Sequence, residues 1–446
     1  MRTLVGELKA LARLSAPVVL TQLGLMLMGV VDTLMLSRLG VTELAASALG
    51  NAWQWTWMSF GLGLVIGIDP LISQAHGRGD GPGAALALQR GVVLAVAISV
   101  PIAACLWHSQ AALTLLGQEP AVAELAQHYN RFKLPTVPCF LVYTALRQYL
   151  QGRTLMAPPT WVIWGANLLH VPLNWALIFG HAGFPALGVA GAAIASSLST
   201  LLMLACLALV TRLLGLHEGA WRPWGRDSFD LAGLRHVFRL GLPVGLQLGF
   251  ETCAFACATL MAGRLGRASL AGHQIVLNLA SFSFMVPLGV SQGAATRVGN
   301  LIGAGDHDGM RRAVRAGLLL SVLVMSCSAL TFSLFRFQLP RLYSDDVQVV
   351  ALAAQILPLA AAFQLFDGLQ VVAGGMLRGM GRPDAAALVN LLGYYVVALP
   401  LAYLACFSWQ RGLPGIWLAL AVGLMVVALA LLVWVRRTAR RPLAAV

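Results

Sequence analysis

The sequence has 446 residues, of which 59% are hydrophobic and only 11% are charged, and its mean hydropathy is +0.78. A soluble protein carries about 25% charged residues, so this composition excludes an ordinary soluble domain and indicates an integral membrane protein. The formal net charge is +13, but the basic residues lie in short loops between apolar segments. That distribution excludes nucleic-acid binding and favours contact with a membrane surface.

Twelve apolar segments are long enough to cross about 30 Å of hydrocarbon. The first six are predicted at 15–38, 46–73, 86–108, 131–151, 160–180 and 187–213. The second six are predicted at 240–263, 270–299, 313–337, 355–377, 385–407 and 413–435. The sequence therefore predicts an all-α integral membrane protein with 12 transmembrane helices.

The chain contains two copies of one six-helix unit. With an offset of 226 residues, positions 15–80 align with 241–306 without a gap, and 17 of the 66 pairs are identical. An even number of spans per copy inserts both copies in the same orientation, which predicts a parallel internal repeat. We expect an N-terminal lobe at 1–214, a cytoplasmic linker at 215–239 and a C-terminal lobe at 240–446.

The loop charges predict the orientation in the membrane. If both termini are cytoplasmic, the inner side carries 22 Lys and Arg residues and the outer side carries 8. Basic residues accumulate on the cytoplasmic side of membrane proteins. We therefore predict that both termini are cytoplasmic.

Three acidic residues, Asp32, Glu251 and Asp367, each lie alone inside a predicted span. A carboxylate at the centre of a membrane helix costs about 2.5–3.5 kcal/mol on insertion scales, so an intramembrane acid is by default a candidate functional residue. No arginine is predicted at the depth of these acids, which leads us to expect a mobile cation as their counter-charge. The alternative is that each acid only holds helices together through hydrogen bonds.

The internal repeat provides a comparison for these acids, because each has an uncharged counterpart in the other copy. Asp32 corresponds to Ala258 and Glu251 to Leu25 at the offset of 226, and Asp367 corresponds to Thr144 at the offset of 223 that aligns the fourth and fifth spans. The fold therefore does not require the acids. Their distribution predicts one acid in the N-terminal lobe and a pair in the C-terminal lobe.

Polar residues in the predicted spans are candidate substrate ligands, with interhelical hydrogen bonding as the alternative for each. Together with Asp32, the candidates are Gln22, Asn51, His170, Asn174, Gln274 and Asn278.

Several motifs, in order and spacing, resemble the multidrug and toxic compound extrusion (MATE) family, most closely its NorM-like branch. They are residues 29–35 (GVVDTLM), 271–275 (AGHQI), 286–289 (VPLG) with 297–299 (RVG), and 366–372 (FDGLQVV) with 377–379 (LRG). The resemblance covers essentially the whole chain. It implies two six-helix lobes around a central cleft in the bacterial cytoplasmic (inner) membrane.

The resemblance also implies a secondary active antiporter that exports cationic or lipophilic drugs in exchange for Na⁺ or H⁺, with no other cofactor. By resemblance, Glu251, Asp367 and Asp32 are the cation-coupling residues. Glu251 and Asp367 form the ion site that could hold Na⁺, Asp32 is the acid of the N-terminal lobe and contributes to the drug or ion site, and Pro17 is the helix-bending proline. One departure is that His170 and Asn174 stand where the DinF-like branch has an asparagine and an aspartate. We expect a monomer surrounded by membrane lipids.

Three other functions remain as alternatives. A flippase for a lipid or lipid-linked substrate shares this helical plan, but the expected cavity is acidic, whereas a pyrophosphate requires cationic residues. An enzyme is not expected, because the sequence contains no HExxH, GxSxG or P-loop motif. A passive channel fits poorly, since isolated acids in separate lobes suit binding and release better than a conduction ring.

Overall fold

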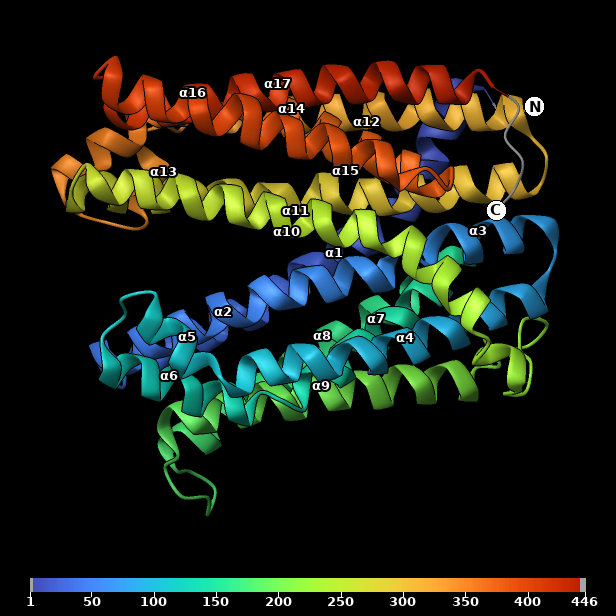
Figure 1. Cartoon of the computed structure of the whole chain (residues 1–446), viewed down its shortest axis with the longest axis horizontal. Helices are drawn as coiled ribbons and strands as arrows, with labels where there is room; N and C mark the ends of the chain where they lie inside the picture. The colour runs from blue at the N-terminus through green and yellow to red at the C-terminus, as the bar shows by residue number, and fades with distance from the viewer. Residues whose placement is uncertain (1–2, 442–446) are drawn as a thin grey trace. The chain divides into compact units, whose positions relative to one another are not determined.

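The computed structural model describes residues 3–441, and within that range it is built of helices joined by short connections, with no β-strand (Figure 1). The elements are α1 (Leu4–Leu36), α2 (Val41–Ile66), α3 (Asp69–Arg78), α4 (Gly81–Trp107), α5 (Ser109–Leu115), α6 (Pro120–Phe132), α7 (Thr136–Gly152), α8 (Ala157–Phe179), α9 (Gly188–Leu213), η1 (Arg226–Ser228), α10 (Leu231–Arg264), α11 (Arg267–Gly303), α12 (His307–Leu334), α13 (Gln338–Arg341), α14 (Val347–Gly379), α15 (Pro383–Leu392), η2 (Gly393–Ala398), α16 (Leu399–Tyr403), η3 (Leu404–Ser408) and α17 (Gly412–Ala439).

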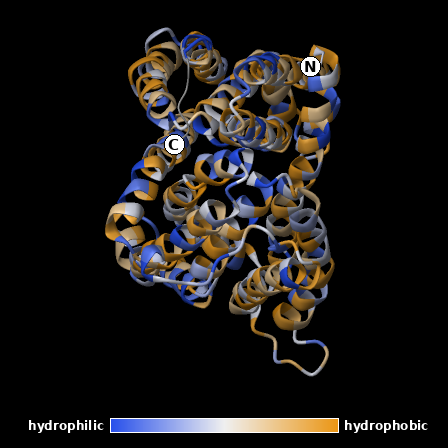
Figure 2. Cartoon of the chain, turned by 90° about the vertical axis from the view of Figure 1, so that its right-hand side faces the viewer, coloured by the Kyte–Doolittle hydropathy of each residue, from blue (hydrophilic) through white to orange (hydrophobic). Residues whose placement is uncertain are grey.

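Eleven helical segments in the described part of the chain are long and apolar enough to cross a membrane. In a view turned by 90°, the ribbons carry many hydrophobic residues, shown in orange, with hydrophilic residues, shown in blue, between them (Figure 2). They cover every predicted span except the one at 131–151, where α7 has only 17 residues. A helix of that length extends about 25 Å, slightly less than the hydrocarbon thickness. The prediction of an all-α, multi-span membrane protein is confirmed.

Contacts between Cα atoms divide the chain into two compact units. Unit 1 comprises residues 1–22 and 246–446, and unit 2 comprises residues 23–245. Two continuous helices, α1 and α10, therefore contribute one part to each unit. The lobe boundaries expected from the sequence, 1–214 and 240–446, are not tested by this division and stay a prediction.

Within unit 1, α14 packs against α11, α12 and α17 (Figure 1). Within unit 2, α7 packs against α4 and α9, and α8 packs against α9. The helices that contain the third predicted span of each copy, α4 and α12, begin with the same cap. Asp80 accepts a hydrogen bond from the Gly83 amide at 2.8 Å, and Asp306 accepts one from the Gly309 amide at 2.7 Å. These caps satisfy amides that have no partner inside the helix.

In unit 2, glycines bring α2 and the first half of α10 into backbone contact. A Cβ atom on Gly63 would collide with the backbone of Gly245, and one on Gly67 would collide with the backbone of Gly241. Small residues four positions apart allow membrane helices to approach this closely.

The internal repeat places the same contact in unit 1. Gly289 and Gly293 of α11 are the counterparts of Gly63 and Gly67, and they pack on α1. A Cβ atom on Gly289 would lie 2.7 Å from the backbone nitrogen of Val19, and one on Gly293 would lie 3.3 Å from Cα of Ser15. The first half of α1 therefore belongs to unit 1 for the same packing reason that the first half of α10 belongs to unit 2.

A buried ion pair adds to this contact in unit 1 only. Nε of Arg297 lies 2.6 Å from Oε1 of Glu7, and its Nη2 lies 3.1 Å from Oε2. The side chain of Glu7 is 2% exposed. The repeat counterparts are Gly233 and Leu71, which cannot form this pair. A two-point contact of this kind holds both side chains in one orientation.

Candidate functional site

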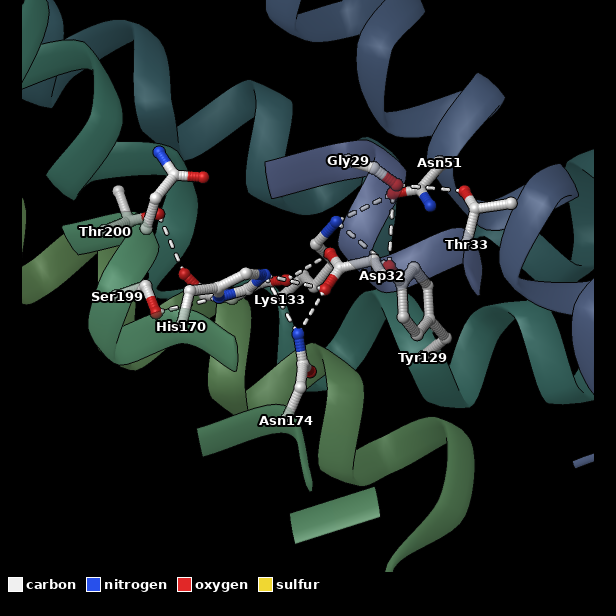
Figure 3. A network of polar contacts seen from close by, with 12 residues as sticks. Gly29, Asp32, Thr33, Asn51, Tyr129, Lys133, His170, Asn174, Ser199 and Thr200 are labelled. Carbon is white, nitrogen blue, oxygen red and sulfur yellow. Dashed lines mark hydrogen bonds and ion pairs between the residues drawn. The ribbon is translucent and has the colours of Figure 1, made fainter. Parts of the chain in front are cut away.

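A buried cluster of polar side chains surrounds Asp32 in unit 2 (Figure 3). Asp32 lies near the end of α1 and is 6% exposed. Its Oδ1 atom lies 2.7 Å from Nδ2 of Asn174 and 2.8 Å from Nε2 of His170, both on α8. Ser196 of α9 donates its hydroxyl to Oδ2 at 2.8 Å. The carboxylate is therefore held by three side chains from two helices.

The protonation of His170 decides which of these contacts are hydrogen bonds. Its Nε2 atom lies 2.9 Å from Nδ2 of Asn174, and its Nδ1 atom lies 2.9 Å from Oγ of Ser199. Nε2 donates to Asp32 when it carries a proton, and it can accept from Asn174 only when it does not. The imidazole therefore exchanges partners when its proton moves, while Asn174 retains Asp32 as an acceptor.

Lys133, the cap at the end of α6, brings a second basic group to the cluster (Figure 3). It is 7% exposed, and its Nζ atom donates to Oδ1 of Asn51 at 2.7 Å and to the hydroxyl of Tyr129 at 3.1 Å. The ammonium also lies 4.8 Å from the centre of the Tyr129 ring. Its charge interacts with that of Asp32.

The sequence predicts only that no arginine lies at the depth of Asp32, whereas the structure brings two other basic side chains to it: His170 contacts the acid directly and Lys133 lies close by. Lys133 falls in the span predicted at 131–151, but in the structure it caps α6 and is buried. A mobile cation at Asp32 stays a prediction.

Unit 1 contains a different site, in which two carboxylates lie close together. Glu251 of α10 and Asp367 of α14 interact through their charges, and both interact with Tyr394. Asp367 is 5% exposed and Tyr394 is fully buried. Oδ1 of Asp367 makes no hydrogen bond with any described residue, and the Tyr394 hydroxyl lies beside Glu251 but outside hydrogen-bond geometry. In the described residues no Lys, Arg or His forms an ion pair with either acid.

The backbone around Tyr394 is a π-helical turn, η2. In a regular α-helix the carbonyl of Val396 would accept from the amide of residue 400, which is a proline and has no N–H. In the wider π-helical turn a carbonyl pairs with the amide five residues on, so it does not depend on an N–H at residue 400. Such turns commonly occur at functional sites. Pro400 thus helps to set the direction in which Tyr394 faces the acids.

The family model for MatE matches residues 17–176 and 243–404, one match in each copy of the repeat. The chain belongs to the MatE family.

Relatives and solved structures of the MatE family extend this assignment over the full length. The chain is 38% identical to a probable multidrug resistance protein NorM of Mesorhizobium japonicum, with 97% of this chain and 94% of the relative covered. It is 32% identical to the multidrug resistance protein MdtK of Pectobacterium atrosepticum, with 100% and 98% covered. The crystal structure of the eukaryotic MATE transporter AtDTX14 shares the fold, with a TM-score of 0.91, 24% identity and 98% of each chain covered.

The structure brings some of the predicted site residues of this MatE-family chain together and leaves others apart. Asp32, Asn51, His170 and Asn174 belong to one cluster. Gln22 is ten residues before Asp32 in α1. That is about 15 Å along the helix axis, so Gln22 cannot touch the same carboxylate.

Two further candidates lie on α11 of the MatE-family chain. Asn278 donates a hydrogen bond to the carbonyl of Gln274 at 2.9 Å, so this side chain is used within its own helix. Pro17 lies inside α1, as expected for a helix-bending residue, and its counterpart Pro243 lies inside α10. The roles assigned to these residues stay predictions.

Four members of the two MatE-family sites were not identified from the sequence: Tyr129, Lys133, Ser196 and Tyr394. For Lys133 a signal existed, because only 2 of the 30 basic residues are lysines, and the other, Lys9, lies close to the N-terminus. For Ser196 and Tyr394 no comparable signal exists, since serine and tyrosine are common in membrane helices. Only the packing of α9 on α8, and the turn at η2, places them against the acids.

Proposed function

We propose that this protein is a secondary active efflux antiporter that exports cationic or lipophilic compounds in exchange for Na⁺ or H⁺. The names of the NorM and MdtK relatives describe multidrug resistance, which supports export of small organic molecules. The coupling ion binds at Glu251 and Asp367, and Asp32 contributes to ion or drug binding.

One observation carries this proposal: among residues 3–441, the carboxylate pair of unit 1 has no ion pair with a basic side chain. Two like charges that interact in a buried place are unfavourable unless a cation or a proton compensates them. Asp367 retains an oxygen without a hydrogen bond, so the pair has a free ligand atom to offer. Hard cations prefer oxygen ligands, and the hydroxyl of Tyr394 adds a third oxygen beside the two acids.

The Asp32 cluster suits a different task. Its acid accepts hydrogen bonds from Asn174 and Ser196, and the charge of Lys133 interacts with it, so the site is already furnished with polar partners. A ligand or a proton that enters this cluster must exchange with one of these partners. Coupling then requires that the ion and the drug stabilise different states of the transporter.

The loop charges support an orientation with both termini on the cytoplasmic side. The bacterial NorM and MdtK relatives support a location in the cytoplasmic membrane, where we propose that the protein acts as a monomer. Nothing in the two sites calls for a resident cofactor other than the transported ion.

The test is efflux of ethidium from proteoliposomes, driven separately by an imposed Na⁺ gradient and an imposed pH gradient. We expect wild-type protein to respond to at least one gradient, and Glu251→Gln and Asp367→Asn to abolish that response. Asp384→Asn, which changes an acid in the first turn of α15, is the matched control and should leave transport unchanged. Gradient-driven efflux at the wild-type rate in both site variants would disprove the proposed ion site.

A further inference from the structure

A groove on the surface of unit 1 combines an apolar floor with a basic end. It has a volume of about 640 Å³ and lies between α12, α14 and α17, next to the start of α1. The apolar lining residues are Val314, Leu318, Leu319, Val322, Leu369 and Leu432. Leu319 is 45% exposed and Val322 is 39% exposed, so the floor is open to the surroundings of the helices. In a membrane protein these surroundings are lipid.

Four arginines line one end of the groove: Arg311, Arg315, Arg436 and Arg440. Arg311 is already engaged, because it bonds the carbonyls of Ala439 and Arg440 and pairs with Asp308. The side chains of Arg315, Arg436 and Arg440 make no ion pair or hydrogen bond within residues 3–441. The groove therefore ends in three uncompensated guanidinium groups.

These arginines lie at the membrane end where basic residues predominate. They belong to the first turns of α12 and the last turns of α17. These turns lie at the end of unit 1 where α1 begins and α17 ends (Figure 1). In the proposed orientation this end faces the cytoplasm. The cytoplasmic leaflet carries anionic lipids that attract basic residues near the membrane surface.

The internal repeat contains the same groove in unit 2, with different chemistry. The second groove has a volume of about 510 Å³. Four lining residues of the second groove have a counterpart that lines the groove of unit 1. Leu88 corresponds to Val314, Val92 to Leu318, Leu146 to Leu369 and Arg212 to Arg436. The apolar groove is thus a property of the repeated unit, since both copies form it.

The basic end is repeated only in part, because Arg212 is the counterpart of Arg436. Gln89 stands where unit 1 has Arg315, and it is bonded to the Arg222 carbonyl at 2.8 Å and to the Ser228 hydroxyl at 2.7 Å. Leu216 stands at the place of Arg440. The second groove ends in Arg212, His217 and two tryptophans. Two free arginines, Arg315 and Arg440, therefore distinguish the groove of unit 1 from its copy.

We propose that the groove of unit 1 binds one anionic phospholipid of the cytoplasmic leaflet. The phosphate lies among Arg315, Arg436 and Arg440, and an acyl chain lies along the floor between α12, α14 and α17. Guanidinium groups bind phosphate oxygens in pairs, which gives the arginine cluster its selectivity for charge. The apolar floor favours a lipid over a free phosphate ion, because only a ligand with an acyl chain can cover the apolar side chains of the floor.

The experiment measures thermal unfolding of the full-length purified protein in detergent with added phosphatidylglycerol, phosphatidylcholine or inorganic phosphate. A ligand that binds only the folded state raises the melting temperature. We expect phosphatidylglycerol to raise it and the other two to have little effect. Arg315→Gln/Arg436→Gln should weaken apparent phosphatidylglycerol binding about tenfold, which corresponds to the loss of about one strong charged contact.

The matched control is Arg382→Gln/Arg437→Gln, which removes the same charge at the same end of unit 1 from residues that do not line the groove. It should retain the response to phosphatidylglycerol, as should Arg212→Gln in the second groove. Leu432→Trp fills the groove without changing charge and should lose the response. Native mass spectrometry of the same proteins should show one retained phosphatidylglycerol in the wild type and none in the groove variants.

Three outcomes would overturn the proposal. Equal stabilisation by phosphatidylcholine would show that charge is not recognised, and equal stabilisation by inorganic phosphate would show a soluble anion site. Equal loss in the Arg382→Gln/Arg437→Gln control would show a general surface-charge effect. None of these outcomes bears on drug efflux, which is measured by the separate gradient assay.

Discussion

Nε2 of His170 lies 2.8 Å from Oδ1 of Asp32, so a side chain of α8 contacts the acid of α1 directly. The second ring nitrogen faces Ser199 of α9, and Asn174 approaches both His170 and the acid. His170 therefore contributes a contact to Asp32 and a contact to α9.

Replacing His170 should test the contact to Asp32. His170→Gln retains a donor to Asp32, whereas His170→Ala removes the donor. We expect His170→Gln to keep part of the efflux activity and His170→Ala to lose more, because a hydrogen bond to a charged group contributes about 1.5–3 kcal/mol. Proteoliposome efflux of the two variants and the wild type makes the comparison, and equal rates in His170→Ala and the wild type would contradict it.

Lys133 should act through its charge and its hydrogen bonds together. Lys133→Met keeps most of the side-chain volume but removes the bonds that Nζ donates to Oδ1 of Asn51 and to the Tyr129 hydroxyl, which leaves Asn51 Oδ1 with the Tyr129 hydroxyl as its donor. The loss of a hydrogen bond from a charged group costs about 1.5–3 kcal/mol. Lys133→Arg keeps the positive charge. We expect a lower melting temperature and slower efflux in Lys133→Met, with a smaller effect in Lys133→Arg. Equal melting temperatures for Lys133→Met and the wild type would argue against a buried role.

Glu251 and Asp367 should behave as one site. If they bind the same ion, either substitution alone removes most of the coupling, and the second adds little. We expect ion-driven efflux of the double variant Glu251→Gln/Asp367→Asn to match that of the more severe single variant. Independent sites would instead show losses that multiply. The measurement is the initial rate of gradient-driven efflux for the three variants and the wild type.

The glycine contact of unit 2 should be intolerant of a single methyl group. A Cβ atom on Gly63 would collide with the Gly245 backbone, whereas one on Gly165 would meet no atom within 4 Å. We expect Gly63→Ala to destabilise the protein by about 1–3 kcal/mol through overpacking. Gly165→Ala, also in a helix, should be neutral or slightly stabilising because alanine favours helix. Thermal unfolding in one detergent compares them, and equal melting temperatures would contradict the close contact.

The ion pair of Glu7 and Arg297 should show strong coupling in a double-mutant cycle. Removing one partner leaves the other charge buried, which costs about 3–5 kcal/mol in comparable pairs. We therefore expect Glu7→Gln and Arg297→Gln each to lower the melting temperature, and the double variant to be less unstable than the sum of the two. Additive effects would indicate that the 2.6 Å contact contributes little.

The sequence determines the architecture, because lipid imposes simple requirements on each segment. A span must be apolar and about 20 residues long, so hydropathy locates it, and the 226-residue repeat identifies the two copies. The prediction fails where a helix meets these requirements only partly. α7 is short and carries buried polar groups, and the end of α6 carries Lys133 into the interior.

For the sites, the sequence determines which residues are unusual but not what surrounds them. Asp32, Glu251 and Asp367 are recognisable because an isolated charge in an apolar run is expensive. Whether such a charge is compensated depends on neighbours that come from other helices. Asp32 meets His170 and Lys133, whereas Glu251 and Asp367 meet each other and Tyr394. Only the tertiary structure decides this, because helix packing and the π-helical turn set side-chain directions that spacing along the chain does not encode.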